Sequence, residues 1–269
     1  MTRLIEDWIE DISDSIGEYE HELKSKSGYD YAGLAAAACG LSPDTIRLAS
    51  ACEKAAVIPV TTGLGEIGSF SGSVAAILRH MNIETFVTQK TDVAGIYEAH
   101  QKGASILFLA DDQRFIAVNL TKNRVAENSQ ATAWGYAAAL EGAVGSLKGK
   151  EVLVIGCGEV GRHALHCLKH KGAVPVAHDI DERVLAHLSD EGFKIITDTG
   201  RIREYPLMID ASSEGNWIHK GMLHPEAWVV TPGVPLSLTP EAYEFHRNRV
   251  IHDYLQIGVA VMLAMVCRS

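Results

Sequence analysis

The sequence has few of the residues that would link it to disulfides, nucleic acids or membranes. Its five cysteines form no Cys-x-x-Cys pair, so we expect reduced thiols, no metal and a cytoplasmic protein. Lys and Arg number 24 against 34 Asp and Glu, which argues against nucleic acid as a partner because phosphates require clustered cations. The longest apolar run, residues 257–266, is too short to cross a bilayer, which takes about 20 residues. The acidic first residues do not resemble a signal peptide, so we expect no membrane partner.

What the sequence does contain is typical of a globular protein of one or two domains, with 47% hydrophobic and 22% charged residues. In the first half, apolar residues at helical spacing over 4–16 predict an amphipathic helix. A second helix is predicted at 43–56, since Pro43 suits a first helical turn. Alternating apolar segments then predict a small sheet covered by helices, with strands at 57–60, 85–88 and 105–110 and helices at 74–81 and 93–102.

An Ala-rich segment at 129–147 predicts a helix that connects the two halves, with Ser129 as its N-cap. Lys148-Gly149-Lys150 ends it, so we expect domains at 1–147 and 148–269. The second half predicts a parallel, doubly wound sheet with strands at 151–155, 174–178, 193–196, 207–211 and 228–231. Residues 253–267 read as a buried C-terminal helix, and an exposed apolar face on it would suit a homodimer.

One motif in the second half predicts a cofactor. Gly156-Cys157-Gly158-Glu159-Val160-Gly161 follows the apolar strand 152–155 and opens a helix. The first glycine permits a tight turn, the second lets a pyrophosphate approach the backbone, and the third lets the helix pack on the strand. Free N–H groups at the helix N-terminus would hold the phosphates. We therefore expect a C-terminal Rossmann-like sheet in an α/β protein with a smaller N-terminal helical and α/β domain.

The strand after this motif indicates which dinucleotide binds. Asp179 closes that strand, where its carboxylate can accept hydrogen bonds from the ribose and would repel a 2′-phosphate. The expected cofactor is therefore NAD rather than NADP. The loops containing Ser212 and Thr231-Pro232-Gly233 end later strands of the sheet and are expected to flank the nicotinamide.

A second hexamer, Gly63-Leu64-Gly65-Glu66-Ile67-Gly68, fits the same pattern. No carboxylate is placed for a ribose at the end of the next strand, which closes with Gln89-Lys90, so a second dinucleotide site is rejected. Two interpretations stay open: a turn between a strand and a helix, or an anion site for a substrate carboxylate.

Polar residues at strand and helix ends supply the remaining candidates. Asp111 follows an apolar strand at the end where ligands bind in open α/β sheets, so it could cap a turn, bind an ammonium group or transfer a proton. Asn128 could cap the connecting helix or line a cleft between the domains. His163, His166 and His170 share one predicted helix face without a carboxylate companion, so we expect a polar surface and no metal.

Together these segments resemble the pyrrolysine synthase (PylD) family over roughly residues 40–265. The resemblance rests on first-domain segments that the glycine loop alone would not single out: Val57-Ile58-Pro59-Val60-Thr61-Thr62-Gly63, Gly68-Ser69-Phe70-Ser71, Leu109-Ala110-Asp111-Asp112 and Asn128.

The resemblance implies NAD-dependent oxidation of the terminal amine of 3-methylornithyl-N6-lysine, a small amino-acid substrate, with ammonia release and ring closure to pyrrolysine. It implies substrate contacts at Thr62, Asp111 and Asn128, and at Leu4 on an N-terminal lid. The family pattern has serine where Thr62 stands, which keeps the hydroxyl and adds a methyl group. For the chemistry, we expect Asp111 to accept the substrate's proton and later assist water loss.

Two other functions fit parts of the sequence. One is a different two-domain NAD(P)-dependent dehydrogenase, of the methylenetetrahydrofolate or shikimate type, acting on a small polar metabolite. The other is a regulatory module that binds NAD without turnover. The hydroxyls and carboxylate of Thr61, Thr62 and Asp111 argue against the second.

Overall fold

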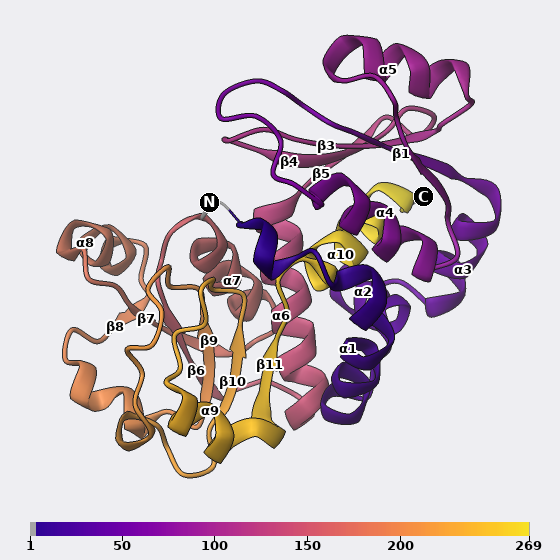
Figure 1. Ribbon diagram of the computed structural model, residues 1–269. Helices are drawn as coiled ribbons and strands as arrows, with labels where there is room; N and C mark the ends of the chain where they lie inside the picture. The colour runs from indigo at the N-terminus through magenta and orange to yellow at the C-terminus, as the bar shows by residue number, and fades with distance from the viewer. Residues whose placement is uncertain (1–3, 269) are drawn as a thin grey trace.

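Two β-sheets joined by a long helix, α6, make up the computed structural model, which describes residues 4–268 without the side chains of residues 49–51 (Figure 1). The first sheet is built from residues 54–127 and the second from residues 151–252. Figure 1 shows the two sheets at different ends of the molecule, with α6 (Asn128–Val144) and α10 (Gln256–Cys267) between them. The expected α/β class is confirmed.

The first sheet has the strand order β2-β1-β3-β4-β5. Its strands are β1 (Lys54–Ile58), β2 (Glu84–Val87), β3 (Ile106–Ala110), β4 (Phe115–Asn119) and β5 (Arg124–Glu127). The first three pair in parallel, and β4 and β5 add an antiparallel hairpin that the sequence did not predict. Residues 54–56, predicted to end a helix, instead begin β1. Pairing of Ala55 with Thr85 and Ile106 outweighs the helix propensity of alanine here.

Helices cover both faces of this sheet. They are η1 (Glu6–Trp8), α1 (Ile12–Ser27), α2 (Tyr31–Cys39), α3 (Pro43–Cys52), α4 (Phe70–His80) and α5 (Asp92–Gln101). Successive residues of a strand point to opposite faces. Val57 accordingly packs in the main core with Val74 of α4, and Ile58 packs in a separate cluster with Ala99 of α5.

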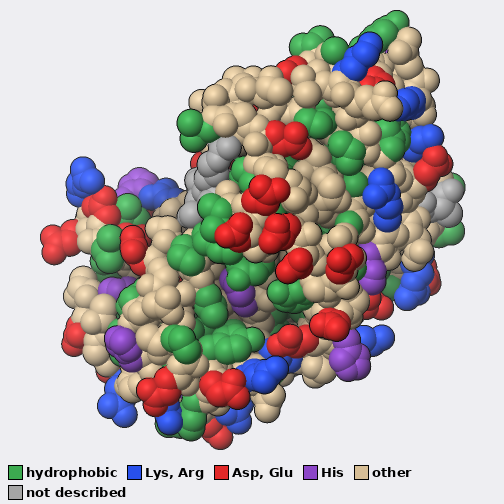
Figure 2. Space-filling view, viewed as in Figure 1, with side chains coloured by type: hydrophobic (Ala, Val, Ile, Leu, Met, Phe, Trp, Pro, Cys, Tyr) green, Lys and Arg blue, Asp and Glu red, His purple; other side chains and the backbone are tan. Residues whose placement is uncertain are grey.

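The N-terminal segment differs from the single helix predicted for it. A 3₁₀ turn at Glu6–Trp8 comes first, and α1 begins only at Ile12. The break lets the Trp8 ring stack on Tyr254 of the second half, with ring centroids 5.9 Å apart. Ile9 is fully buried. Exposed acidic side chains gather over this segment, in the middle of the face that Figure 2 shows.

The second sheet is parallel throughout, in the order β11-β10-β9-β6-β7-β8. Its strands are β6 (Glu151–Ile155), β7 (Val174–His178), β8 (Lys194–Ile195), β9 (Leu207–Asp210), β10 (Trp228–Thr231) and β11 (Val250–His252). Its helices are α7 (Glu159–His170), α8 (Glu182–Asp190), α9 (Pro240–His246) and the 3₁₀ turns η2 (Thr199–Glu204), η3 (Lys220–Met222) and η4 (Arg247–Arg249). This order confirms the predicted doubly wound sheet, with the dinucleotide crevice expected where β6 meets β9. Only the short β11 was not predicted.

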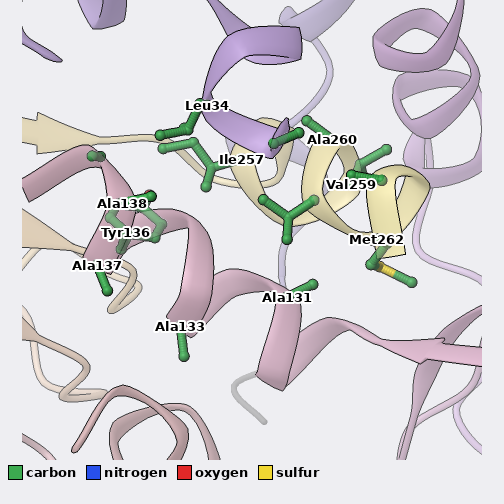
Figure 3. Close-up of a cluster of buried hydrophobic side chains, with 14 of the residues drawn as sticks. Leu34, Ala131, Ala133, Tyr136, Ala137, Ala138, Ile257, Val259, Ala260 and Met262 are labelled. Carbon is green, nitrogen blue, oxygen red and sulfur yellow. The ribbon is translucent and has the colours of Figure 1, made fainter. Parts of the chain in front are cut away.

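Helices α6 and α10 cross at close range in the middle of the molecule. Figure 3 shows Tyr136 and Ala138 of α6 beside Ile257 of α10, whereas Ala133 and Ala137 point to the other side of α6. A Cβ built at Gly135 would lie 2.3 Å from Ile257 Cγ2, so only glycine allows this approach. The predicted cap at Ser129 was wrong. The helix begins one residue earlier, and the buried Ser129 Oγ has no hydrogen-bond partner among the described residues.

Helix α10 packs on the first half of the chain rather than on its own sheet. Its contacts with α6, α2 and β5 leave nearly every residue buried. The helix therefore offers no exposed apolar face for the homodimer considered from the sequence. The division after residue 147 stays a prediction, since α10 lies beyond that boundary but packs before it. No helix in residues 4–268 is long and apolar enough to cross a membrane.

Candidate active site

A cavity of about 920 Å³ lies between the two sheets. Its walls come from the carboxyl ends of β1 and β3 in the first sheet and of β6, β7 and β11 in the second, together with one face of α6. This volume is at the upper end for small-molecule sites, which span about 300–1,000 Å³. Ligands in open α/β sheets bind at this edge of the strands.

The glycine-rich turn forms one wall of the cavity. Gly156 has φ +75°, and a Cβ at Gly161 would lie 1.9 Å from the carbonyl oxygen of Gly156. Both glycines are thus required by the fold. Gly158 differs, because its φ is an ordinary −68° and no atom lies within 4 Å of a Cβ built on it. Gly158 lines the cavity. Because it has no side chain, a ligand can approach its backbone closely.

The other residues of the turn divide by position. Glu159 and Val160 line the cavity at the start of α7, whose first N–H groups have no partner within the helix. Cys157 is 1% exposed and lies outside the lining. Burial raises the pKa of its thiol to about 12. Cys157 is therefore a packed neutral thiol whose backbone N–H shapes the turn.

Asp179 is joined directly to this turn. Its Oδ2 accepts the N–H of Cys157 at 2.6 Å, its Oδ1 accepts the N–H of Asp181, and the residue lines the cavity. The neighbouring Ile180 also lines the cavity and is 92% exposed. A carboxylate and an uncovered apolar side chain thus lie side by side at the end of β7. This arrangement fits the ribose and adenine of a dinucleotide.

The loops after β9 and β10 complete the cofactor end. Ser212, Pro232 and Gly233 line the cavity, whereas Thr231 is fully buried beside Asp210. Asp210 orders both loops: its Oδ1 accepts the N–H of Ser212 and its carbonyl oxygen accepts the N–H of Gly233, each at 3.1 Å. Burial raises the pKa of its carboxyl. The groups present therefore fit a dinucleotide lying across the glycine turn.

Asp111 lines the opposite side of the cavity, at the end of β3. Its Oδ1 accepts the N–H groups of Arg114 and Gln113, at 2.7 and 2.8 Å. These two bonds, the Arg114 one foremost, lower the pKa of the Asp111 carboxyl. The residue thus caps the β3–β4 turn and presents an ionised carboxylate to the cavity, an arrangement suited to binding a cation.

The three other predicted substrate contacts lie in different settings. Asn128 is the first residue of α6 and lines the cavity together with Thr132 and Tyr136 of the same helix. Leu4 also lines it. Thr62 lies on the exposed loop after β1 and is not part of the cavity wall.

The second glycine hexamer forms a turn that binds an anion belonging to the protein itself. Asp112 Oδ2 accepts the N–H of Leu64 at 2.6 Å, and a Cβ at Gly63 would lie 2.0 Å from the same oxygen. Thr61 is held in turn by Asp92, through both its backbone N–H and its hydroxyl. The hexamer is therefore a turn between a strand and a helix, and the carboxylate that its Leu64 N–H binds is that of Asp112 rather than that of an external ligand.

The charged side chains of the cavity wall are all acidic. No Lys or Arg is found among the described residues that line it, and its carboxylates are Glu66, Asp111, Asp112, Glu159, Asp179, Glu214 and Asp253. Such a wall attracts cations and repels anions. Sequence reasoning missed Glu66, Asp253 and Tyr136. For Asp253, the available signal was its place two residues after the short apolar segment Val250–Ile251.

The histidines on α7 belong to the surface. His166 is exposed, and its Nε2 lies 3.5 Å from Glu191 Oε2. Within residues 4–268 no three metal-ligating side chains lie together.

The fold defines a class, the α/β proteins with a Rossmann-like dehydrogenase fold. The shikimate dehydrogenase of Aquifex aeolicus shares this fold with a TM-score of 0.54, over 81% of this chain and 91% of that one, at 12% identity. Residues 8–126 match the family described as "Pyrrolysine biosynthesis protein PylD, N-terminal domain". The pyrrolysine synthases of Methanosarcina barkeri and Methanosarcina acetivorans are 32% and 30% identical, over 99% and 98% of this chain and 98% of each relative. The chain belongs to the pyrrolysine synthase family, which confirms the resemblance found in the sequence.

Proposed function

We propose that the protein oxidises the terminal primary amine of 3-methylornithyl-N6-lysine with NAD and so forms pyrrolysine. The amine-bearing carbon loses a hydride and becomes an imine, and hydrolysis of the imine releases ammonia and leaves an aldehyde. The substrate's α-amino group attacks the aldehyde, and loss of water closes the ring. Relative to the substrate, the product has lost one ammonia and two hydrogens.

One observation supports this function above all others: an acid-lined cavity that adjoins a glycine turn with room for a pyrophosphate. Glu66, Asp111 and Asp112 line the part formed by the first sheet, with no Lys or Arg among the described residues of the wall. A substrate carrying several ammonium groups suits this wall. A purely anionic metabolite would be repelled by it.

The cofactor, when bound, supplies the hydride acceptor. The proposed contacts are the turn Gly156–Gly161 for the pyrophosphate, Asp179 for the ribose, and Ser212 with Thr231-Pro232-Gly233 around the nicotinamide. Thr231 is buried and would contribute indirectly, by positioning the loop Pro232-Gly233 that follows it. Because Asp179 is a carboxylate, a 2′-phosphate beside it would be repelled, which favours NAD over NADP.

On the substrate side, Asp111 would bind an ammonium group and Asn128 would offer its amide from the first turn of α6. Leu4 would close over the substrate from the N-terminal segment, whose Trp8 is stacked on Tyr254. The contact at Thr62 rests on the family resemblance alone. It requires the loop after β1 to approach the cavity when substrate binds.

The test is incubation of the protein with NAD and 3-methylornithyl-N6-lysine, followed by NADH absorbance and mass spectrometry of the product. We expect NADH to form together with a product that lacks one ammonia and two hydrogens. Parallel incubations with NADP and with lysine serve as controls. Turnover of a different metabolite would support another two-domain dehydrogenase, and NAD binding without any turnover would support a regulatory module. Either result refutes the proposal.

A further inference from the structure

Asp253 is an acidic residue of the cavity wall that the proposed function has not used. It follows β11 directly, and β11 pairs in parallel with β10, whose following loop lines the cofactor end. Because parallel strands end at one edge of a sheet, Asp253 lies beside that loop at the edge of the sheet that borders the cavity. It is 7% exposed, and it belongs to the cavity wall.

The structure holds Asp253 in position from two helices. Its backbone N–H donates to the Tyr136 hydroxyl at 2.9 Å, and the same hydroxyl lies 3.0 Å from its carbonyl oxygen. Its carboxylate accepts the N–H of Ile257, in the first turn of α10, at 3.1 Å. The adjacent Gly258 contacts Asn128, where a Cβ would lie 2.5 Å from Oδ1. Asp253 and the predicted substrate ligand Asn128 thus flank the same helical turn.

The surroundings of this carboxyl favour its neutral form. Burial raises its pKa to about 7, although the N–H groups of Ile257 and its neighbours act in the opposite direction. Tyr136 on α6, Tyr31 on α2 and Tyr19 on α1 face it, and burial together with the charge of Asp253 raises the pKa of each phenol. All three therefore stay neutral near pH 7.

The ionic groups behind Asp253 are already partnered. Lys26 Nζ bonds Glu22 Oε1 and the carbonyl oxygen of Val250, each at 2.5 Å. Burial lowers the pKa of the preceding His252, so that imidazole is neutral. No cationic side chain of residues 4–268 forms an ion pair with Asp253. A cation that enters from the cavity would be the first charged partner of this carboxyl.

We propose that Asp253, rather than Asp111, takes the proton from the reacting ammonium group of the substrate. An N–H bond of the ammonium breaks, an O–H bond forms on the Asp253 carboxylate, and the nitrogen keeps the electron pair that then assists hydride departure to NAD from the adjacent carbon. Asp111 stays ionised and holds an ammonium in place. This assignment rests on the proposed oxidation of an amine.

The difference between the two carboxyl groups is large enough to decide the roles. An alkylammonium has a pKa of about 10, and an ordinary aspartate one of about 4. An acceptor near 7 gives about 10³ times more neutral amine at equilibrium than an acceptor near 4. Asp111, whose pKa is lowered further by two N–H groups, is a weaker base than an ordinary aspartate.

Turnover against pH, from about pH 6 to 10, separates these roles in Asp253→Asn and the matched control Asp111→Asn. We expect Asp253→Asn to lower kcat at pH 7 about 10²-fold or more with little change in KM. Its rate should then rise about tenfold per pH unit as the amine loses its own proton. Asp111→Asn should raise KM and keep the wild-type pH profile. A wild-type kcat and pH profile in a folded Asp253→Asn would overturn the assignment. Absence of product with wild-type protein would instead refute the proposed function.

A calorimetric readout tests the same group without turnover. Substrate is titrated into wild-type protein without NAD at pH 7, in phosphate and in Tris, and the difference in heat counts the protons exchanged. A carboxyl half-protonated at pH 7 should release about half a proton when it meets the ammonium. Asp253→Asn should release none. If wild-type protein releases no proton between pH 6 and 8, Asp253 only caps α10 and the assignment is refuted. This outcome is measured on the wild-type protein and so does not depend on the folding of a variant.

Discussion

Asp253→Asn should stabilise the protein at neutral and alkaline pH while it impairs turnover. Asp253 is 7% exposed, and burial raises its pKa from 3.8 to about 7. The folded state therefore binds this proton more tightly than the unfolded state. The resulting stability is fully present below about pH 4 and is lost as the pH rises through about 7. Three pKa units at 1.36 kcal/mol each make this loss about 4 kcal/mol.

The amide in Asp253→Asn removes the ionisation and can still accept the N–H of Ile257. Between pH 5 and pH 8 the variant should therefore gain about 3 kcal/mol in free energy of unfolding relative to the wild type, since about two of the three pKa units lie above pH 5. Urea unfolding at pH 5, 6, 7 and 8 measures the difference, in which all other titrations cancel. A difference that does not change with pH, or a variant less stable than wild type at pH 8, would refute the raised pKa.

Asp111→Asn gives the opposite sign in the same urea experiment. Because the N–H groups of Arg114 and Gln113 lower its pKa, its stabilising contribution is present above the ordinary carboxyl pKa of about 4 and is lost as the pH falls below it. The variant should therefore be less stable than wild type at pH 7, with a gap that narrows on acidification. An equal gap at pH 7 and pH 3 would contradict the turn-capping role.

Three further predictions concern ligand binding. Gly158→Ala should leave the melting temperature unchanged and weaken NAD binding about tenfold, since a methyl group would overpack the pyrophosphate by about 1–3 kcal/mol. Gly161→Ala, whose Cβ would lie 1.9 Å from a carbonyl oxygen, should instead lower the melting temperature. Equal effects of the two substitutions would contradict the idea that the space at Gly158 holds the pyrophosphate. Asp179→Ala should weaken the preference for NAD over NADP in calorimetry, and an unchanged ratio would argue against a ribose contact. Asp111→Asn should raise KM about tenfold through the loss of a charged hydrogen bond, as steady-state kinetics will show; a fall in kcat alone would indicate proton transfer instead.

The sequence alone determined the features that depend on neighbouring residues. A run such as Val152–Ile155 followed by Gly156, Gly158 and Gly161 specifies a strand, a turn and a helix, because the φ angles and close contacts involved are local. The same holds for Asp179 at the end of the next strand. The family was likewise identified from short segments, each read in its own context.

The tertiary structure decided what depends on residues far apart in the chain. Whether residues 54–56 form helix or strand depends on pairing partners about 30 and 50 positions later. Burial raises the pKa of Asp253, and that burial depends on elements far apart in the chain, among them α6, more than a hundred residues earlier, whose Tyr136 hydroxyl accepts the Asp253 N–H. The same folding excluded Thr62 from the cavity wall and buried α10 within the chain. Burial and charge at a site are sums over all neighbours, and in this protein most of those neighbours meet only when the two sheets close on α6 and α10.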